Sequence, residues 1–115
     1  MKNIVIAGSN QNLAEALQDN GANITIIDGV ISAEKLTAAD IGDADIFILC
    51  NLAEATAIPV AKNINPSIQT VVYASDSLPE FVRAQLDLAL DPELFTPQVV
   101  ADELLQVSVD SSSSN

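Results

Sequence analysis

The stretch Asn3–Leu17, NIVIAGSNQNLAEAL, decides the fold of this chain, because it runs from a buried strand through a turn into a helix. Ile4–Ala7 is a continuous apolar run, Gly8 is a turn residue, and apolar positions from Leu13 onward recur with helical spacing. Strand, glycine turn and helix in this order are typical of the first unit of a nucleotide-binding α/β protein. The open question is whether this turn can still hold a phosphate.

Apolar runs and helical patterns alternate along the rest of the chain, with short connections between them. Such alternation requires right-handed crossovers and predicts parallel strands that are buried on both faces. The sequence therefore predicts a three-layer, Rossmann-like α/β fold, a doubly wound sheet of five parallel strands in the order 2-1-3-4-5. The predicted strands are Ile4–Ala7, Ile24–Ile27, Ile46–Leu49, Thr70–Tyr73 and Leu88–Leu90, and the predicted helices are Leu13–Asp19, Ala33–Ala39, Leu52–Ile64, Leu78–Leu86 and Pro97–Gln106.

The chain has 115 residues, enough for one domain, which we place at residues 1–107. Residues 108–115 are polar and rich in serine, so we expect a disordered tail. Pro59 falls inside the third helical pattern, so that helix is either kinked or begins later. The predicted helix caps are Ser32, Asn51 with Glu54, Ser77 with Glu80, and Thr96 before Pro97.

Charge limits the partners that this chain can have. With 4 Lys and Arg against 16 Asp and Glu, the net charge is -12, which repels nucleic acid and anionic membranes. No signal or membrane-spanning pattern is present, and Cys50 is the one cysteine, so we expect a cytoplasmic protein. Abundant acid, few lysines and small apolar residues favour a halophilic protein, although an ordinary acidic surface remains the alternative.

In a sheet of this order, ligands bind beyond the carboxyl ends of the strands, where the order reverses between the first and third strands. The residues predicted to meet there are Gly8, Ser9, Asn10, Asp28, Gly29, Cys50, Asn51, Ser75, Asp76 and Asp91. Any site for a small molecule should be sought among them.

The turn itself departs from the dinucleotide fingerprint G-x-G-x-x-G, of which only Gly8 remains. Asn10 puts a side chain where the pyrophosphate would approach, and Leu13 puts a large one where helix and strand should touch. Asp28, twenty residues after Gly8 at the end of the second strand, matches the ribose-binding acid, and Lys35 is the one nearby cation. Tight dinucleotide binding is therefore not favoured over binding of an adenine mononucleotide or nucleoside, held by Asp28 and the free amides at the start of the first helix, and both stay open.

Metal and catalytic sites find little support in the sequence. Asp28, Asp76 and Asp91 could converge on magnesium, but separate acids at strand ends are ordinary in so acidic a chain. The sequence contains no histidine, so Cys50 and the serines lack a base to activate them. We therefore predict no metal site and no catalytic residue.

Three segments, Asn3–Asp28, Ile41–Asp76 and Leu86–Leu105, together resemble the TrkA-N or RCK nucleotide-binding regulatory domain of potassium transport proteins. IGDADIFIL is similar to that family's fourth-strand entry, and LALDPELFTPQVVADELL to its last strand and helix. Between Asp28 and Ala44 the chain is one βα unit shorter than that family. It is still more similar to a short family of uncharacterised proteins from halophilic archaea, some of them labelled CTP synthetase.

The resemblance implies a ligand-sensing domain that binds NAD or an adenine nucleotide and pairs as a homodimer. The residues that would contact the nucleotide are Gly8, Ser9, Asn10, Asp28, Lys35, Asn51 and Ser75. A domain that kept the fold, lost the nucleotide and binds other proteins is the alternative.

A homodimer is also suggested by the closing helix, whose apolar positions between Val99 and Val109 cover more than one narrow stripe. The alternative is that the segment after Gln106 folds back as an edge strand within one monomer.

Overall fold

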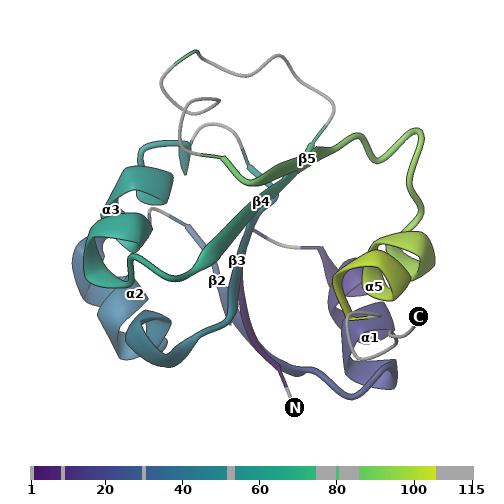
Figure 1. The fold of residues 1–115 in the computed structure, drawn as a ribbon, viewed down its shortest axis with the longest axis horizontal. Helices are drawn as coiled ribbons and strands as arrows, with labels where there is room; N and C mark the ends of the chain where they lie inside the picture. The colour runs from purple at the N-terminus through teal and green to yellow at the C-terminus, as the bar shows by residue number, and fades with distance from the viewer. Residues whose placement is uncertain are drawn as a thin grey trace.

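The computed structural model describes residues 2–8, 10–29, 31–51, 54–74, 80 and 86–105, and these form one five-stranded sheet (Figure 1). All neighbouring strands are parallel and their order is β2-β1-β3-β4-β5, so the predicted doubly wound α/β fold is confirmed. Each predicted strand agrees with the structure to within one residue. The strands are β1 (Asn3–Ala7), β2 (Asn23–Ile27), β3 (Ile46–Leu49), β4 (Gln69–Tyr73) and β5 (Leu88–Leu90).

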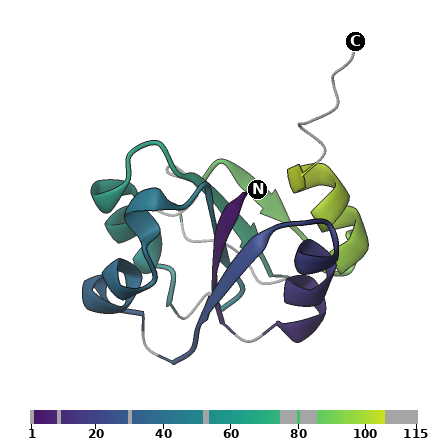
Figure 2. The same ribbon diagram turned by 90° about the horizontal axis from the view of Figure 1, so that it is seen from below.

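Helices cover both faces of the sheet (Figure 2). One face carries α1 (Gln11–Asp19) and α5 (Pro97–Leu105); the other carries α2 (Ala33–Ala38), the short 3-10 helix η1 (Ile41–Asp43) and α3 (Ala57–Ile64). Most of the predicted helix Leu78–Leu86 and everything after Leu105 lie outside the described residues. Among the helices that are described, none has the length and apolar character needed to cross a membrane.

The interior strand β1, which lies between β2 and β3, belongs to both hydrophobic cores. Its side chains alternate between the faces, so Ile4 and Ile6 pack against α1 and α5 while Val5 and Ala7 pack toward α2 and α3. None of these four residues is more than 2% exposed. The near-continuous apolar run of the sequence is thus explained by burial on both sides of the sheet.

Two of the four predicted helix caps are confirmed. The N–H of Lys35 donates to Ser32 Oγ at 3.2 Å, and that of Val99 to Thr96 Oγ1 at 3.3 Å. A further cap, which was not predicted from the sequence, is formed at Asn10, whose Oδ1 accepts from the Leu13 N–H at 3.0 Å. Each bond satisfies an amide that the first helical turn leaves without a partner inside the helix. The predicted cap at Ser77 with Glu80 lies outside the described residues, because Ser77 is not among them.

The third helix begins later than predicted. α3 starts at Ala57 and follows Thr56, so Asn51 is not its cap. Pro59 is consequently the third helical residue, where its missing N–H has no partner inside the helix. The sequence left two alternatives for Pro59, and the later start is the correct one.

Asp87 ties together the amino-terminal ends of β4 and β5. Its Oδ2 accepts from the Thr70 N–H at 2.8 Å, the Thr70 hydroxyl at 3.2 Å and Lys62 Nζ at 3.1 Å. Partial burial acts to raise the pKa of Asp87, but the bonds from Thr70 and the bond and charge of Lys62 outweigh it, so this pKa lies below its ordinary value. Thr70 is fully buried, and its amide depends on this carboxylate.

We expect Asp87→Ala to lower the free energy of unfolding by about 1–3 kcal/mol near neutral pH, because it removes the carboxylate to which the amide and hydroxyl of buried Thr70 donate. Lys62→Met is the matched control, since it removes only a partly exposed ion pair and should cost about 1 kcal/mol or less. A lowered carboxyl pKa stabilises the fold above the unfolded-state pKa, so the difference from wild type should shrink as the pH falls below about 4. Urea unfolding of wild type and both variants between about pH 3 and pH 7 measures these free energies. Equal losses of stability in the two variants would contradict the role given to the bonds between Asp87 and Thr70.

Candidate functional site at the carboxyl ends of the strands

A pocket of about 410 Å³ lies where the strand order reverses, as the topology predicts. It brings together residues that follow three strands: Gly8 after β1, Asp28 and Gly29 after β2, and Cys50 and Asn51 after β3. Glu54, on the segment before α3, completes the described lining. Five residues of the predicted crevice therefore share one cavity.

The other predicted residues are placed differently. Asn10 and Lys35 are described but do not line the pocket, and Ser9, Ser75 and Asp76 lie outside the described residues. Asp91 follows β5, at the opposite edge of the sheet from Asp28. Four strand spacings separate these two edges, roughly 19 Å, so Asp28 and Asp91 cannot share a magnesium ion.

Gly8 is required by the closeness of the neighbouring strand end. Its φ is +108°, and a Cβ added there would lie 3.3 Å from the Cβ of Cys50. The Gly8 N–H donates to the Ile27 carbonyl at 2.9 Å, which fixes the turn against β2. A larger residue would strain the backbone and crowd the end of β3, so Gly8 has a structural role whether or not a ligand binds.

Asn10 occupies the place where α1 would bind an anion. Helix amino termini bind phosphates through amides that have no partner inside the helix, and Asn10 Oδ1 already accepts from the Leu13 N–H. Leu13 itself is fully buried in the core formed with β1, so its side chain fills the position where a glycine would allow closer packing. Both departures from the dinucleotide fingerprint thus stabilise the helix and its packing.

Lys35 is held by the backbone beside the pocket. Its Nζ donates to the Asp28 carbonyl oxygen at 3.1 Å and lies 3.5 Å from where a Cβ of Gly29 would stand. Gly29 has a φ of +76°, a left-handed conformation that turns the β2–α2 loop next to the Lys35 side chain. The bond from Lys35 thus joins α2 to the end of β2, and Lys35 itself does not line the pocket.

Glu54 is the contact that sequence reasoning missed. Its Oε1 accepts from the Ile31 N–H at 2.8 Å and so joins the segment before α3 to the β2–α2 loop across the pocket. The sequence suggested instead that Glu54 reaches back toward a cap at Asn51, which is wrong because α3 does not begin there. Pro59 was the available signal, because a proline is best placed in the first turn of a helix and so indicates a start near Ala57. With that start, Glu54 precedes the helix and can bond to a residue distant in the sequence.

The ionisable groups of the pocket disfavour both anions and nucleophilic chemistry. Asp28 and Glu54 contribute the carboxylates of its described lining. Burial raises the pKa of the Cys50 thiol to about 11, although the hydrogen bond with the Asn10 side chain acts to lower it. A thiol with so high a pKa is almost wholly protonated at physiological pH, and the protonated form is a poor nucleophile.

A search of the described residues for three or more metal-ligating side chains in one cluster finds none.

Solved structures define the class of fold. A Burkholderia thailandensis protein assigned to pilus assembly (cpaE) has a TM-score of 0.68 at 21% identity, over 94% of this chain and 98% of its own. The orphan response regulator HP1043 of H. pylori has a TM-score of 0.71 at 12% identity, over 90% of this chain and 92% of its own. An atypical orphan response regulator with a phosphorylation-independent regulatory mechanism has a TM-score of 0.69 at 12% identity, over 98% of this chain and 99% of its own. This chain thus shares its small α/β fold with these response regulators and with this pilus assembly protein.

Its family follows from the sequence. Residues 4–104 match DUF7126, a family of unknown function, and the chain belongs to that family. A search of curated proteins finds no match. The resemblance to TrkA-N or RCK domains stays a prediction.

We expect Asn10→Ala to lower the free energy of unfolding by about 0.5–2 kcal/mol, because it removes the cap of α1. Asn12→Ala, on the exposed side of the same helix, is the matched control and should be neutral or slightly stabilising, since alanine favours the helix. Chemical denaturation monitored by circular dichroism measures both. Equal effects would mean that the bond between Asn10 and Leu13 contributes nothing measurable.

We also expect the Cys50 thiol of the folded protein to react slowly. With a pKa of about 11, roughly one thiol in a thousand is ionised at about pH 8. The rate of labelling by a chromogenic disulfide should rise about tenfold for each pH unit up to about pH 10. Protein unfolded in urea provides the control and should react as an ordinary thiol; the same rate in folded protein would show that Cys50 is accessible and activated.

Proposed function

We propose that this chain is a non-catalytic regulatory domain that acts through contacts with another protein, without a bound nucleotide. The observation that carries the proposal is the Asn10 cap, because a side chain of the protein already takes up an amide donor that a phosphate would use. Structural neighbours described as response regulators, one of them working independently of phosphorylation, support a regulatory role for such a fold. The acidic, cysteine-poor chain supports a cytoplasmic location.

The charges at the pocket argue in the same direction. A phosphate placed near Gly8 would face the carboxylates of Asp28 and Glu54, which repel it. Lys35 is the described cation closest to the pocket, and its ammonium group is bonded to the Asp28 carbonyl. That bond holds the ammonium group at the β2–α2 loop, outside the described lining of the pocket.

A weakly bound adenine nucleoside is the second candidate, and it is the one that the TrkA-N or RCK resemblance favours. Its support is that Asp28 and Gly8 line the same cavity, whose volume of about 410 Å³ suits a small ligand. A carboxylate at the end of β2 can accept hydrogen bonds from a ribose diol without any phosphate contact. Asn51 lies in the same lining and could contact the base or sugar.

Pairing of two copies through α5 remains a further prediction of the sequence. Val99 on that helix is 41% exposed, which leaves apolar surface for a partner. Val107 and Val109, which would extend this surface, lie outside the described residues.

Isothermal titration with NADH, AMP and adenosine tests the proposed function. We expect no binding of NADH or AMP in the micromolar range, because their phosphates meet carboxylates and a capped helix. Asp28→Asn is the informative variant: if adenosine binds through the ribose, this variant should weaken it, while Asp102→Asn on α5 should leave it unchanged. Micromolar binding of NADH by the wild type would overturn the proposal in favour of a nucleotide sensor.

A further inference from the structure

Among the described strands, β2 forms one edge of the sheet, and no described segment pairs with its outer side. The N–H of Asn23 bonds to Lys2 and the carbonyl of Ile27 to Gly8, so alternate residues of β2 point toward β1. The N–H and C=O groups of Ile24 and Ile26 therefore point away from the sheet. In the described part of the chain, neither residue forms a backbone hydrogen bond outside the sheet.

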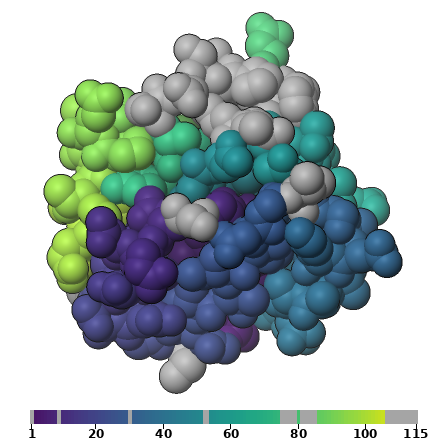
Figure 3. All heavy atoms as spheres, turned by 180° about the vertical axis from the view of Figure 1, so that it is seen from behind, coloured from purple at the N-terminus to yellow at the C-terminus, as the bar shows by residue number. Residues whose placement is uncertain are grey.

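Within the described residues, β2 itself carries no charge, proline or bulge that would protect this edge against pairing. All five residues of β2, NITII, are uncharged, although the chain carries 16 acidic residues. Ile26 is 37% exposed, and the view from behind shows the atoms of β2 at the surface between those of α1 and α2 (Figure 3). Edge strands of soluble proteins are commonly blocked by charges, prolines or bulges, so an uncharged open edge is suited to accepting another strand.

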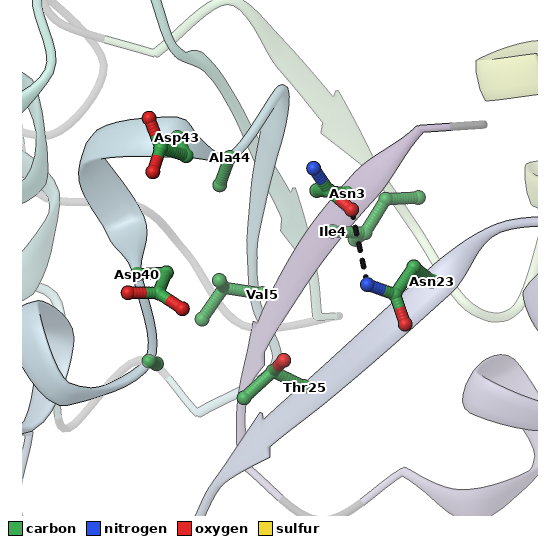
Figure 4. A pocket seen from close by; sticks show the side chains of 9 residues that line it. Asn3, Ile4, Val5, Asn23, Thr25, Asp40, Asp43 and Ala44 are labelled. Carbon is green, nitrogen blue, oxygen red and sulfur yellow. Dashed lines mark hydrogen bonds between the residues drawn. The ribbon is translucent and has the colours of Figure 1, made fainter.

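The two sides of this edge differ in chemistry. On the α1 side, Ile24 and Ile26 present apolar side chains that are not fully covered. On the other side, α2 has only six residues and leaves a cavity of about 210 Å³ between the sheet and η1 (Figure 4). Thr25 lines it from β2, and Asp40 and Asp43 line it from the opposite wall.

Among the described residues, no cation pairs with the two carboxylates of this cavity. The one ion pair found there joins Lys62 to Asp87, toward the opposite edge of the sheet, and both Asp40 and Asp43 are exposed. A lysine or arginine beside Thr25 has a stem long enough to cross that small side chain and reach them.

We propose that the open edge of β2 pairs with an extended segment of a partner protein in which apolar residues alternate with lysine or arginine. The apolar side chains lie beside Ile24 and Ile26, and the basic ones extend over Thr25 toward Asp40 and Asp43. Backbone hydrogen bonds to Ile24 and Ile26 supply the pairing, and the alternation supplies the specificity. This inference rests on the proposed function, since it names the partner of a domain that acts through protein contacts.

A second copy of this chain fits the edge less well. Each copy carries a net charge of -12, and two β2 strands paired across a twofold axis would bring like acidic cavities to the same interface. A basic segment instead neutralises Asp40 and Asp43. Charge complementarity thus favours a different, basic partner.

The test uses a capped peptide of about seven residues that alternates valine with lysine, and a second peptide with glutamate in place of lysine. The whole protein is observed by NMR, with hydrogen exchange at each amide. We expect the lysine peptide to bind, to slow exchange at Ile24 and Ile26 by at least about tenfold, and to bind more weakly in about 1 M salt. The glutamate peptide should not bind.

Two pairs of substitutions separate charge from fold. Asp40→Asn with Asp43→Asn should weaken the lysine peptide about tenfold, the fold-change expected for two exposed ion pairs. Asparagine tolerates the left-handed backbone of Asp40, whose φ is +60°, so the fold should persist. Asp102→Asn with Glu103→Gln, on exposed positions of α5, is the matched control and should change binding less than about twofold.

Three results would each overturn the proposal: binding without protection of Ile24 and Ile26, equal binding of the two peptides, or no binding of the lysine peptide. A fourth is protection of these two amides in the protein alone together with a dimer mass by light scattering, because the occupant would then be a second copy. Failure of this peptide experiment is distinct from failure of the proposed function. The proposed function is tested by nucleotide titration at the pocket beyond the carboxyl ends of the strands, whereas the peptide tests the edge of β2.

Discussion

The pairing of β1 with β2 on one side and β3 on the other is the constraint on which the rest of this structure depends. Because β1 is buried on both faces, its four apolar residues Ile4–Ala7 join the two cores to one another. The chain must leave β1 by a turn that does not collide with β3, and Gly8 supplies it. The reversal of strand order at this point then creates the cavity beyond the strands.

At the turn after β1, a side chain of the protein makes a contact that a phosphate makes in dinucleotide-binding members of this fold class. The amino terminus of α1 retains its positive end, but the Asn10 carboxamide provides the acceptor from within the chain. A neutral internal cap does not depend on the concentration of a ligand, so the helix is stable when the protein is alone. Two contacts then organise the loops around the pocket: Lys35 Nζ donates to the backbone carbonyl of Asp28, and the Ile31 N–H donates to the carboxylate of Glu54.

Much of the fold could be predicted from the sequence because it depends on short-range patterns. The five apolar runs, the caps at Ser32 and Thr96 and the order of the strands all follow from local periodicity and crossover rules. The meeting of Gly8, Asp28 and Cys50 in one cavity follows from the topology alone.

The remainder depends on distances that no local pattern contains. Glu54 finds its partner 23 residues away at Ile31, and the bond between Lys35 and Asp28 depends on the path of one loop. Asp28 and Asp91 look equivalent as acids at strand ends, but only the width of the sheet shows that they cannot meet. The helix α2 has six residues, close to the length predicted from the sequence. That a cavity beside Thr25 and Asp40 follows this helix becomes visible only once the helix is packed on the sheet.

The closeness of Gly8 to Cys50 has an evolutionary consequence. At 3.3 Å from Cys50 Cβ, a side chain on residue 8 would disturb the junction of β1 with β3 even in a molecule that binds nothing. Selection for folding alone is therefore sufficient to retain this glycine after any ligand has been lost. At the other two glycine positions of the fingerprint, Asn10 caps the helix and Leu13 fills the core. A single glycine after the first strand is thus accounted for by packing, and its presence alone is no evidence of a nucleotide site.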